Sequence, residues 1–137
     1  AFEIKSFTKR SMYDWLKKTK SIYDDKDFYK IYLDYPRDEL ISQINIRVQN
    51  MFEKGVVLEV KRFLKHNVSP TKTASKAIGL REIKDYLNKK MEISEVIEKI
   101  SIKTRQYAKR QSTWGRGNMI DWNRINPSSL NKFIKKI

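Results

Sequence analysis

Apolar residues recur every three or four positions along most of this chain, a spacing that places them on one face of an α-helix. The clearest case spans residues 37–54, where the apolar stripe consists of Leu40, Ile41, Ile44, Val48, Met51 and Phe52. Pro36 suits the position just before this helix, and Gly55 suits its carboxyl-terminal cap. Further helices are predicted over residues 2–18 (continuous, or broken around residues 6–11), 56–66, 74 or 79 to 87, 94–114 and 126–134.

Residues 28–35 depart from this pattern, because their sequence FYKIYLDY is rich in aromatic and β-branched residues and stops at Pro36. They predict a β-strand, and residues 120–122 predict a second, weaker one. Because a single strand is not stable without partners, either the strand is misassigned or the chain is a piece of a larger α/β protein. The absence of an initiator methionine agrees with the second interpretation. The predicted fold class is mainly α with one or two short strands.

The chain carries a net charge of +14, from 30 Lys and Arg residues against 16 acidic residues. Two windows contain no acid at all, one between Glu59 and Glu82 and one between Glu98 and Asp121. Their cations are Lys61, Arg62, Lys65, Lys72, Lys76 and Arg81, and then Lys99, Lys103, Arg105, Lys109, Arg110 and Arg116. Such clustering indicates a polyanionic partner, in the first place a nucleic acid. The alternative is a lysine-rich composition with solvated faces.

Composition excludes several other classes of protein. The chain has no cysteine, which rules out disulfides, thiol catalysis and cysteine-ligated zinc. No apolar run approaches the length of a membrane span, and the first residues do not resemble a signal peptide. We therefore expect a cytoplasmic protein that does not contact a membrane. His66 is predicted to be solvated, and no metal site is predicted at Asp24, Asp25 and Asp27.

The helix predicted over residues 94–114, with Ser94 as its amino-terminal cap, has three different faces. Its apolar side, counted from residue 93, consists of Ile93, Val96, Ile97, Ile100, Tyr107, Gln111 and Trp114. One flank carries Lys99, Lys103 and Arg110, and the far side carries Arg105, Lys109 and Arg116. This pattern suits a helix that lies between a hydrophobic core and a phosphate backbone. Trp114 could stack on a base, although the pattern favours a place in the core.

Residues 104–114 read TRQYAKRQSTW, which resembles the TRQYAKRQ-x-TW signature of the tRNA dimethylallyltransferases. Two further motifs occur in the family's order: Arg47-Val48-x-x-Met51 followed by Gly55 and Glu59-Val60, and the segment AIGLRE at residues 77–82. Ala1-Phe2-Glu3 also resembles the end of the family's RALE motif. The resemblance thus covers nearly the whole chain.

The resemblance implies an enzyme that transfers a dimethylallyl group from dimethylallyl diphosphate to the exocyclic amine of the adenosine 3′ of the anticodon. The family's fold resembles a P-loop nucleotide kinase with a helical insertion, so the strands here would join a parallel sheet. The implied partners are a tRNA anticodon stem-loop, with the target base flipped into a channel, and dimethylallyl diphosphate with Mg²⁺. Residues 1–27 would end the helical insertion, and residues 28–137 would belong to the transferase core of a full-length monomer.

By the same resemblance, Arg47 matches an arginine that contacts the substrate diphosphate. Its place at the edge of the apolar stripe, beside Leu40 and Ile44, is also awkward for an unpaired charge; a salt bridge to a neighbouring acid is the alternative. Two segments match tRNA-contacting stretches of the family. They consist of Lys76, Ala77, Ile78, Gly79, Leu80 and Arg81, and of Lys109, Arg110, Gln111, Ser112, Thr113, Trp114, Gly115 and Arg116.

The sequence also departs from the family pattern. Gly115 replaces a large residue, Leu80 replaces a common tyrosine, and Gln43 stands where many relatives have an arginine. The nucleotide-binding motif GxxxxGK[ST] cannot be placed among the four glycines, and the aspartate that would act as general base is missing with it. The chain by itself is therefore expected to be catalytically inactive. A stand-alone basic RNA-binding module without enzymatic activity is the alternative function.

Overall fold

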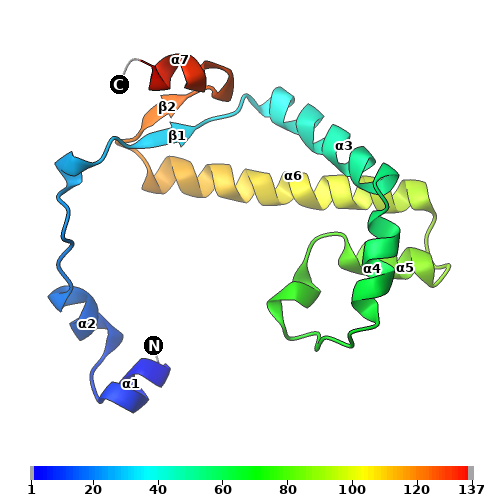
Figure 1. The fold of residues 1–137 in the computed structure, drawn as a ribbon, viewed down its shortest axis with the longest axis horizontal. Helices are drawn as coiled ribbons and strands as arrows, with labels where there is room; N and C mark the ends of the chain where they lie inside the picture. Colours follow the sequence, from blue (N-terminus) through cyan, green and yellow to red (C-terminus); the bar gives the residue numbers. More distant parts are fainter. Residues whose placement is uncertain (1, 136–137) are drawn as a thin grey trace. The chain divides into compact units, whose positions relative to one another are not determined.

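The computed structural model describes residues 2–135 and divides the chain into two units, Ala1–Lys30 and Ile31–Ile137 (Figure 1). The first unit contains helices α1 (Phe2–Thr8) and α2 (Met12–Lys18) and the 3₁₀ helix η1 (Asp25–Asp27). Lys9 interrupts the helix with a φ of 58°, so of the two alternatives for residues 2–18 the broken helix is confirmed. The backbone N–H of Asp14 donates to the Ser11 hydroxyl at 3.1 Å, which caps α2. No described residue of this unit is buried.

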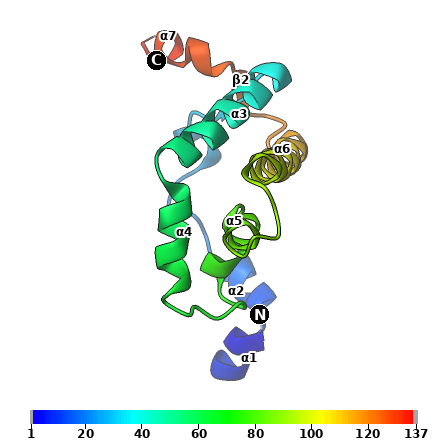
Figure 2. The ribbon, with the colours of Figure 1, turned by 90° about the vertical axis from the view of Figure 1, so that its right-hand side faces the viewer.

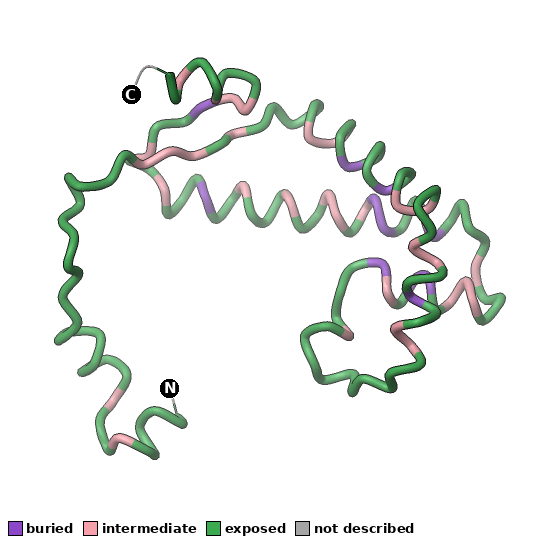
Figure 3. Tube along the Cα trace, in the orientation of Figure 1, coloured by how far each residue is buried: buried purple, intermediate pink, exposed green. Residues whose placement is uncertain are grey.

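The second unit is built around a long helix, α6 (Ile93–Asn118), against which α3 (Arg37–Glu53) and α5 (Leu80–Leu87) pack. Helix α4 (Val56–Leu64) contacts both α3 and α5, and Figure 2 shows α6 nearly end-on with these helices around it. The buried core consists of Ile44, Val48, Val60, Ile83, Val96 and Ile100. Figure 3 shows that buried positions of α6 gather in its amino-terminal half, where α3 and α5 lie. Four residues of the apolar stripe predicted for residues 37–54 belong to this core or pack against it, namely Leu40, Ile44, Val48 and Phe52.

The end of α3 lies where its capping residue predicted it, whereas both predicted ends of α6 need correction. Gly55 adopts a left-handed φ of 88° directly after α3, as expected for a carboxyl-terminal cap. Helix α6 begins at Ile93 after Glu92, not after Ser94, because the backbone N–H of Glu92 donates to the Glu95 carboxylate at 2.9 Å. It also continues through Gly115 and ends at Asn118, beyond the predicted end at residue 114.

Gly115 has a specific packing role inside α6. A Cβ atom at this position would lie 2.7 Å from the Tyr32 ring, well inside van der Waals contact. The glycine therefore lets Tyr32 approach the helix backbone directly. A larger residue at this position would need the space that Tyr32 occupies here.

The predicted strand has a partner within the chain. Strand β1 (Ile31–Leu33) pairs in parallel with β2 (Asn123–Ile125), with Tyr32 opposite Arg124. The first strand is shorter than predicted, and the second begins just after the predicted 120–122. Because the second strand lies at residues 123–125, Ile125 is the residue that is buried there. Ile120 lies before the strand and is exposed in a turn. The strand at residues 28–35 was therefore not misassigned, and its partner within the chain was not predicted because it comes from a distant part of the sequence.

Two short elements follow β2 within the described residues, the 3₁₀ helix η3 (Pro127–Ser129) and helix α7 (Leu130–Ile134). The Asn126 side chain accepts a hydrogen bond from the backbone N–H of Ser128 at 2.9 Å, so the predicted start of this helical segment is confirmed. The 3₁₀ helix η2 (Thr73–Lys76) precedes α5, which itself starts after Gly79. None of the helices within residues 2–135 has the length and apolar character of a membrane span.

Candidate functional site

The first segment predicted to contact tRNA, residues 76–81, is attached to α6 by a tight turn. Gly79 has a φ of 100°, and a Cβ atom there would lie 3.2 Å from Cδ1 of Ile100. Gly79 is buried and Leu80 half-buried, whereas Lys76, Ala77, Ile78 and Arg81 are exposed. Lys76 and Arg81 are thus exposed on either side of this turn, and Arg81 lies beside α6.

A buried carboxylate fixes this turn. Glu82 is only 5% exposed; its Oε2 accepts the backbone N–H of Gly79 at 3.2 Å, and its Oε1 accepts a hydrogen bond from Nζ of Lys103 on α6. Burial alone would raise the pKa of Glu82, but the Lys103 hydrogen bond and charge and the backbone N–H groups together hold that pKa below its ordinary value. Glu82 is therefore ionised at neutral pH and forms a charge-assisted link between α5 and α6.

The second predicted segment, residues 109–116, forms the last turns of α6. Its side chains are exposed except for Ser112, which is half-buried, and Gly115 is buried. Trp114 is 59% exposed, so the interpretation that favoured a core position was wrong. The reason is that Gly115, not Trp114, receives the ring of Tyr32. Trp114 instead lines an apolar pocket together with Tyr32, Arg110, Gln111, Gly115 and Met119.

Arg81 of the first segment and part of the second segment border one face of α6. A groove between α5 and α6 is lined by Arg81, Glu82, Asp85, Met91, Lys99, Ile102, Lys103 and Gln106. From this groove, Lys99, Lys103, Gln106, Arg110 and Trp114 follow one another at spacings of three or four residues, so they share one side of the helix. We call these five residues the α6 track. It leads from Arg81 of the first segment to Arg110 and Trp114 of the second.

The other cations of α6 are divided between two environments. Lys109 and Arg116 are exposed, whereas Arg105 is half-buried, so the second basic stripe is less accessible than its sequence pattern predicts. Arg110 lies 5.7 Å from the centre of the Tyr107 ring, within the range of a cation–π contact. The exposed surface of the carboxyl-terminal half of α6 is therefore both basic and aromatic.

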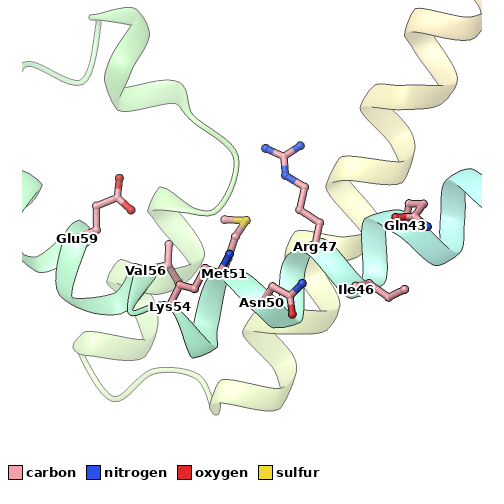
Figure 4. A pocket seen from close by; sticks show the side chains of 8 residues that line it. All are labelled: Gln43, Ile46, Arg47, Asn50, Met51, Lys54, Val56 and Glu59. Atoms are coloured by element: carbon pink, nitrogen blue, oxygen red, sulfur yellow. The ribbon is translucent and has the colours of Figure 1, made fainter. Parts of the chain in front are cut away.

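Arg47 lies in a separate pocket where α3 meets α4, lined by Gln43, Ile46, Arg47, Asn50, Met51, Lys54, Val56 and Glu59 (Figure 4). The Arg47 side chain extends from α3 into the open side of this pocket. It is exposed and makes no ion pair with any residue in 2–135, so the salt-bridge alternative is not what the structure contains. Nor is Arg47 the awkwardly buried charge that its place in the apolar stripe predicted, because it remains in contact with solvent. An anion could reach this guanidinium directly.

Carboxylates elsewhere have structural partners. Asp24 and Asp25 pair with Lys26 and Lys30, and Asp27 accepts the backbone N–H of Asp24 at 2.7 Å, which caps η1. Within the described part of the chain, no three His, Asp or Glu residues are arranged to hold a metal ion.

The sequence did not indicate the tertiary contacts that decide which side chains lie at this surface. The spacing of Gly79 and Glu82 is that of a helix cap and could have indicated the turn, but Lys103 lies 21 residues further on. Tyr32 is still farther from Gly115 in sequence, and no local pattern indicates their contact. Gln106 carries no charge, so the basic pattern of this helix did not indicate that it lines the groove.

Several known proteins are similar to this chain in sequence. The sequence model of the family described as IPP transferase matches residues 1–118. The tRNA dimethylallyltransferase of Pelagibacter ubique is 47% identical over 137 residues, which are 100% of this chain and 44% of that protein. The enzyme of the same name from Agrobacterium fabrum is 40% identical over 129 residues, 93% of this chain and 43% of its own length. The chain thus spans less than half the length of these relatives.

Two solved structures have the same fold over the shared region. The tRNA isopentenylpyrophosphate transferase of Bacillus halodurans has a TM-score of 0.66 at 32% identity, over 83% of this chain and 36% of that one. The tRNA delta(2)-isopentenylpyrophosphate transferase of Staphylococcus epidermidis has a TM-score of 0.68 at 26% identity, over 99% of this chain and 46% of that one. The predicted fold class, mainly α with short parallel strands, is confirmed.

Proposed function

The chain belongs to the IPP transferase family, and from this premise we propose that it is the part of a tRNA dimethylallyltransferase that binds tRNA and faces the diphosphate. The observation that carries the proposal is that Arg81 of the first basic segment borders the same face of α6 that carries Arg110 and Trp114 of the second. Arg81 shares a groove with Lys99 and Lys103, and the same face continues to Arg110 and Trp114. The partner proposed for this surface is the anticodon stem-loop of a tRNA.

The chemistry of the α6 track suits RNA with a single-stranded loop. Lysine and arginine side chains neutralise backbone phosphates without regard to sequence. An exposed indole such as that of Trp114 offers a face on which an unpaired base can stack. Gln111 and Thr113 add neutral groups that can hydrogen-bond to base or sugar. Cations at one end and an aromatic ring at the other would hold a stem and a loop at once.

In the proposed reaction, the exocyclic nitrogen of the target adenosine attacks the dimethylallyl carbon that carries the diphosphate. The new C–N bond forms as the C–O bond breaks, the diphosphate leaves, and the nitrogen loses a proton. Arg47 is the group of this chain that we assign to the leaving diphosphate, whose negative charge increases as the bond breaks. The general base, the P-loop with its nucleotide-binding character and the ligands of any Mg²⁺ are assigned to other parts of the full-length protein.

The organisation of the full-length protein is also a proposal. We assign residues 1–27 to the end of a helical insertion and residues 28–137 to the transferase core. The division of the structure at residue 30 supports this boundary. A monomer in the cytoplasm is the state we propose for the full-length protein.

A titration of the chain with a fluorescent anticodon stem-loop tests the proposed binding function, with a hairpin of scrambled loop sequence as the matched control. We expect preferential binding of the stem-loop. With four phosphate contacts, the affinity should fall by about 50- to 150-fold between about 50 and 200 mM salt. Weak and equal binding of both hairpins would contradict the assignment of tRNA recognition to this chain.

A further inference from the structure

Glu82 is a charged residue that the proposed function does not yet explain. Its carboxylate is buried between α5 and α6, and an ionised group in such a place is costly unless it is paired and hydrogen-bonded. The structure supplies both conditions, through the backbone N–H of Gly79 and the ammonium group of Lys103. The side chain of Lys103 remains 48% exposed, so this bond forms at the edge of the groove and not deep in the core.

The geometry connects this pair to both segments of the proposed RNA surface. Residues 76–81 are held to α6 at Gly79, which packs on Ile100, and again one turn later at Glu82, which binds Lys103. Arg110 follows Lys103 by two helical turns, or roughly 10 Å along the helix axis. Without the Glu82–Lys103 bond, the start of α5 with Arg81, and the turn before it, would be held to α6 by apolar packing.

We propose that Glu82 and Lys103 are positioning residues for tRNA binding, whose ion pair holds residues 76–81 in a fixed place relative to residues 109–116. The inference rests on the proposed function, because it assumes that both segments bind the same RNA. It assigns Lys103 a different role from the other cations of the α6 track. Its charge is used within the protein, and Lys99 and Arg110 are left to face the phosphates.

The Glu82→Gln substitution distinguishes a positioning role of Glu82 from a purely electrostatic effect of its charge, because the two predict opposite changes in RNA affinity. Removing a negative charge beside a polyanion site should raise RNA affinity if only the electrostatic potential matters. Positioning predicts the opposite, because the neutral amide keeps an acceptor for Gly79 but loses the charge-assisted bond to Lys103. We expect the stem-loop affinity to fall roughly tenfold, the size typical of a lost hydrogen bond between charged groups. Lys103→Met should give the same loss, and Lys103→Arg should restore most of it.

Asp85→Asn is the matched control. Asp85 lies one turn after Glu82 on α5 and carries the same charge, but its side chain makes no hydrogen bond or ion pair within residues 2–135. This variant should bind the stem-loop at least as tightly as the wild type. The scrambled hairpin serves as a second control, since positioning predicts that Glu82→Gln changes its affinity little. Thermal unfolding of each variant identifies the temperature range in which all are folded.

Failure of the proposed binding function and failure of the positioning role would give different results. A wild-type chain without preference for the stem-loop would overturn the proposed binding function itself. A wild type that prefers the stem-loop, with Glu82→Gln binding equally or more tightly, would overturn the positioning role alone. The slope of log affinity against log salt gives a further test. It should be unchanged in Lys103→Met, whereas a slope smaller by about one would mean that Lys103 contacts a phosphate directly.

Discussion

Replacing Arg47 by alanine in the full-length protein is expected to lower kcat by about 100- to 1000-fold, the effect typical of removing one preorganised group that stabilises developing charge. The guanidinium is exposed in its pocket and has no ion-pair partner in the described chain, so it is available to an anionic leaving group. The loss should appear in kcat measured with saturating tRNA and dimethylallyl diphosphate. It should not appear in tRNA affinity, because Arg47 is not a residue of the α6 track.

Arg62→Ala is the control for this substitution. Arg62 is an exposed arginine of the neighbouring helix α4 and does not line the Arg47 pocket. Its loss should leave kcat near the wild-type value. Arg47→Lys keeps the positive charge but not the planar pair of donors, so this variant should recover only part of the activity. Unchanged turnover in Arg47→Ala would show that this residue does not act on the diphosphate.

Replacing Lys109, Arg110 and Arg116 together by alanine is expected to give the largest loss of RNA binding. All are exposed on the last turns of α6, and alanine is the residue that best preserves the helix. If each cation contacts one phosphate, the slope of log affinity against log salt should decrease by about two to three. The stem-loop affinity at low salt should fall by tenfold or more, as measured by fluorescence anisotropy.

A second triple variant tests whether the position of the cations matters. Replacing Lys61, Arg62 and Lys65 by alanine removes the same charge from α4 and the residue after it, outside the α6 track. This variant should retain most of the stem-loop affinity. Equal losses in the two variants would mean that binding follows net charge alone. Circular dichroism of both variants would confirm that their helices remain formed.

The helices could be predicted from sequence because their signals are local. The apolar period of residues 37–54 and the glycine after them define α3, and a break around residues 6–11 could be anticipated between α1 and α2. Contacts between residues far apart in the sequence leave no such local signal, so the residues that form them could not be predicted. Ile125 is buried and Ile120 exposed, although both are apolar residues near the predicted strand, and only packing against the rest of the chain distinguishes them.

The same limit applies to the candidate site. The two acid-free windows could be read from the sequence, and the motif at residues 104–114 identified the family. Helical periodicity placed Trp114 with the core residues, but it could not show that the ring of Tyr32 occupies the adjacent position against Gly115. Nor could it show that Glu82 binds Lys103. Those contacts decide which side chains remain exposed and which are held within the protein.

The central claim is that this chain belongs to an enzyme that prenylates tRNA. Its most direct test is to incubate the full-length protein with unmodified tRNA, dimethylallyl diphosphate and Mg²⁺, and to analyse the digested nucleosides by mass spectrometry. We expect dimethylallyladenosine, located at the adenosine 3′ of the anticodon and absent when that base is replaced by guanosine. Tight binding of the tRNA without any prenylated adenosine would contradict this claim and would identify a stand-alone RNA-binding module.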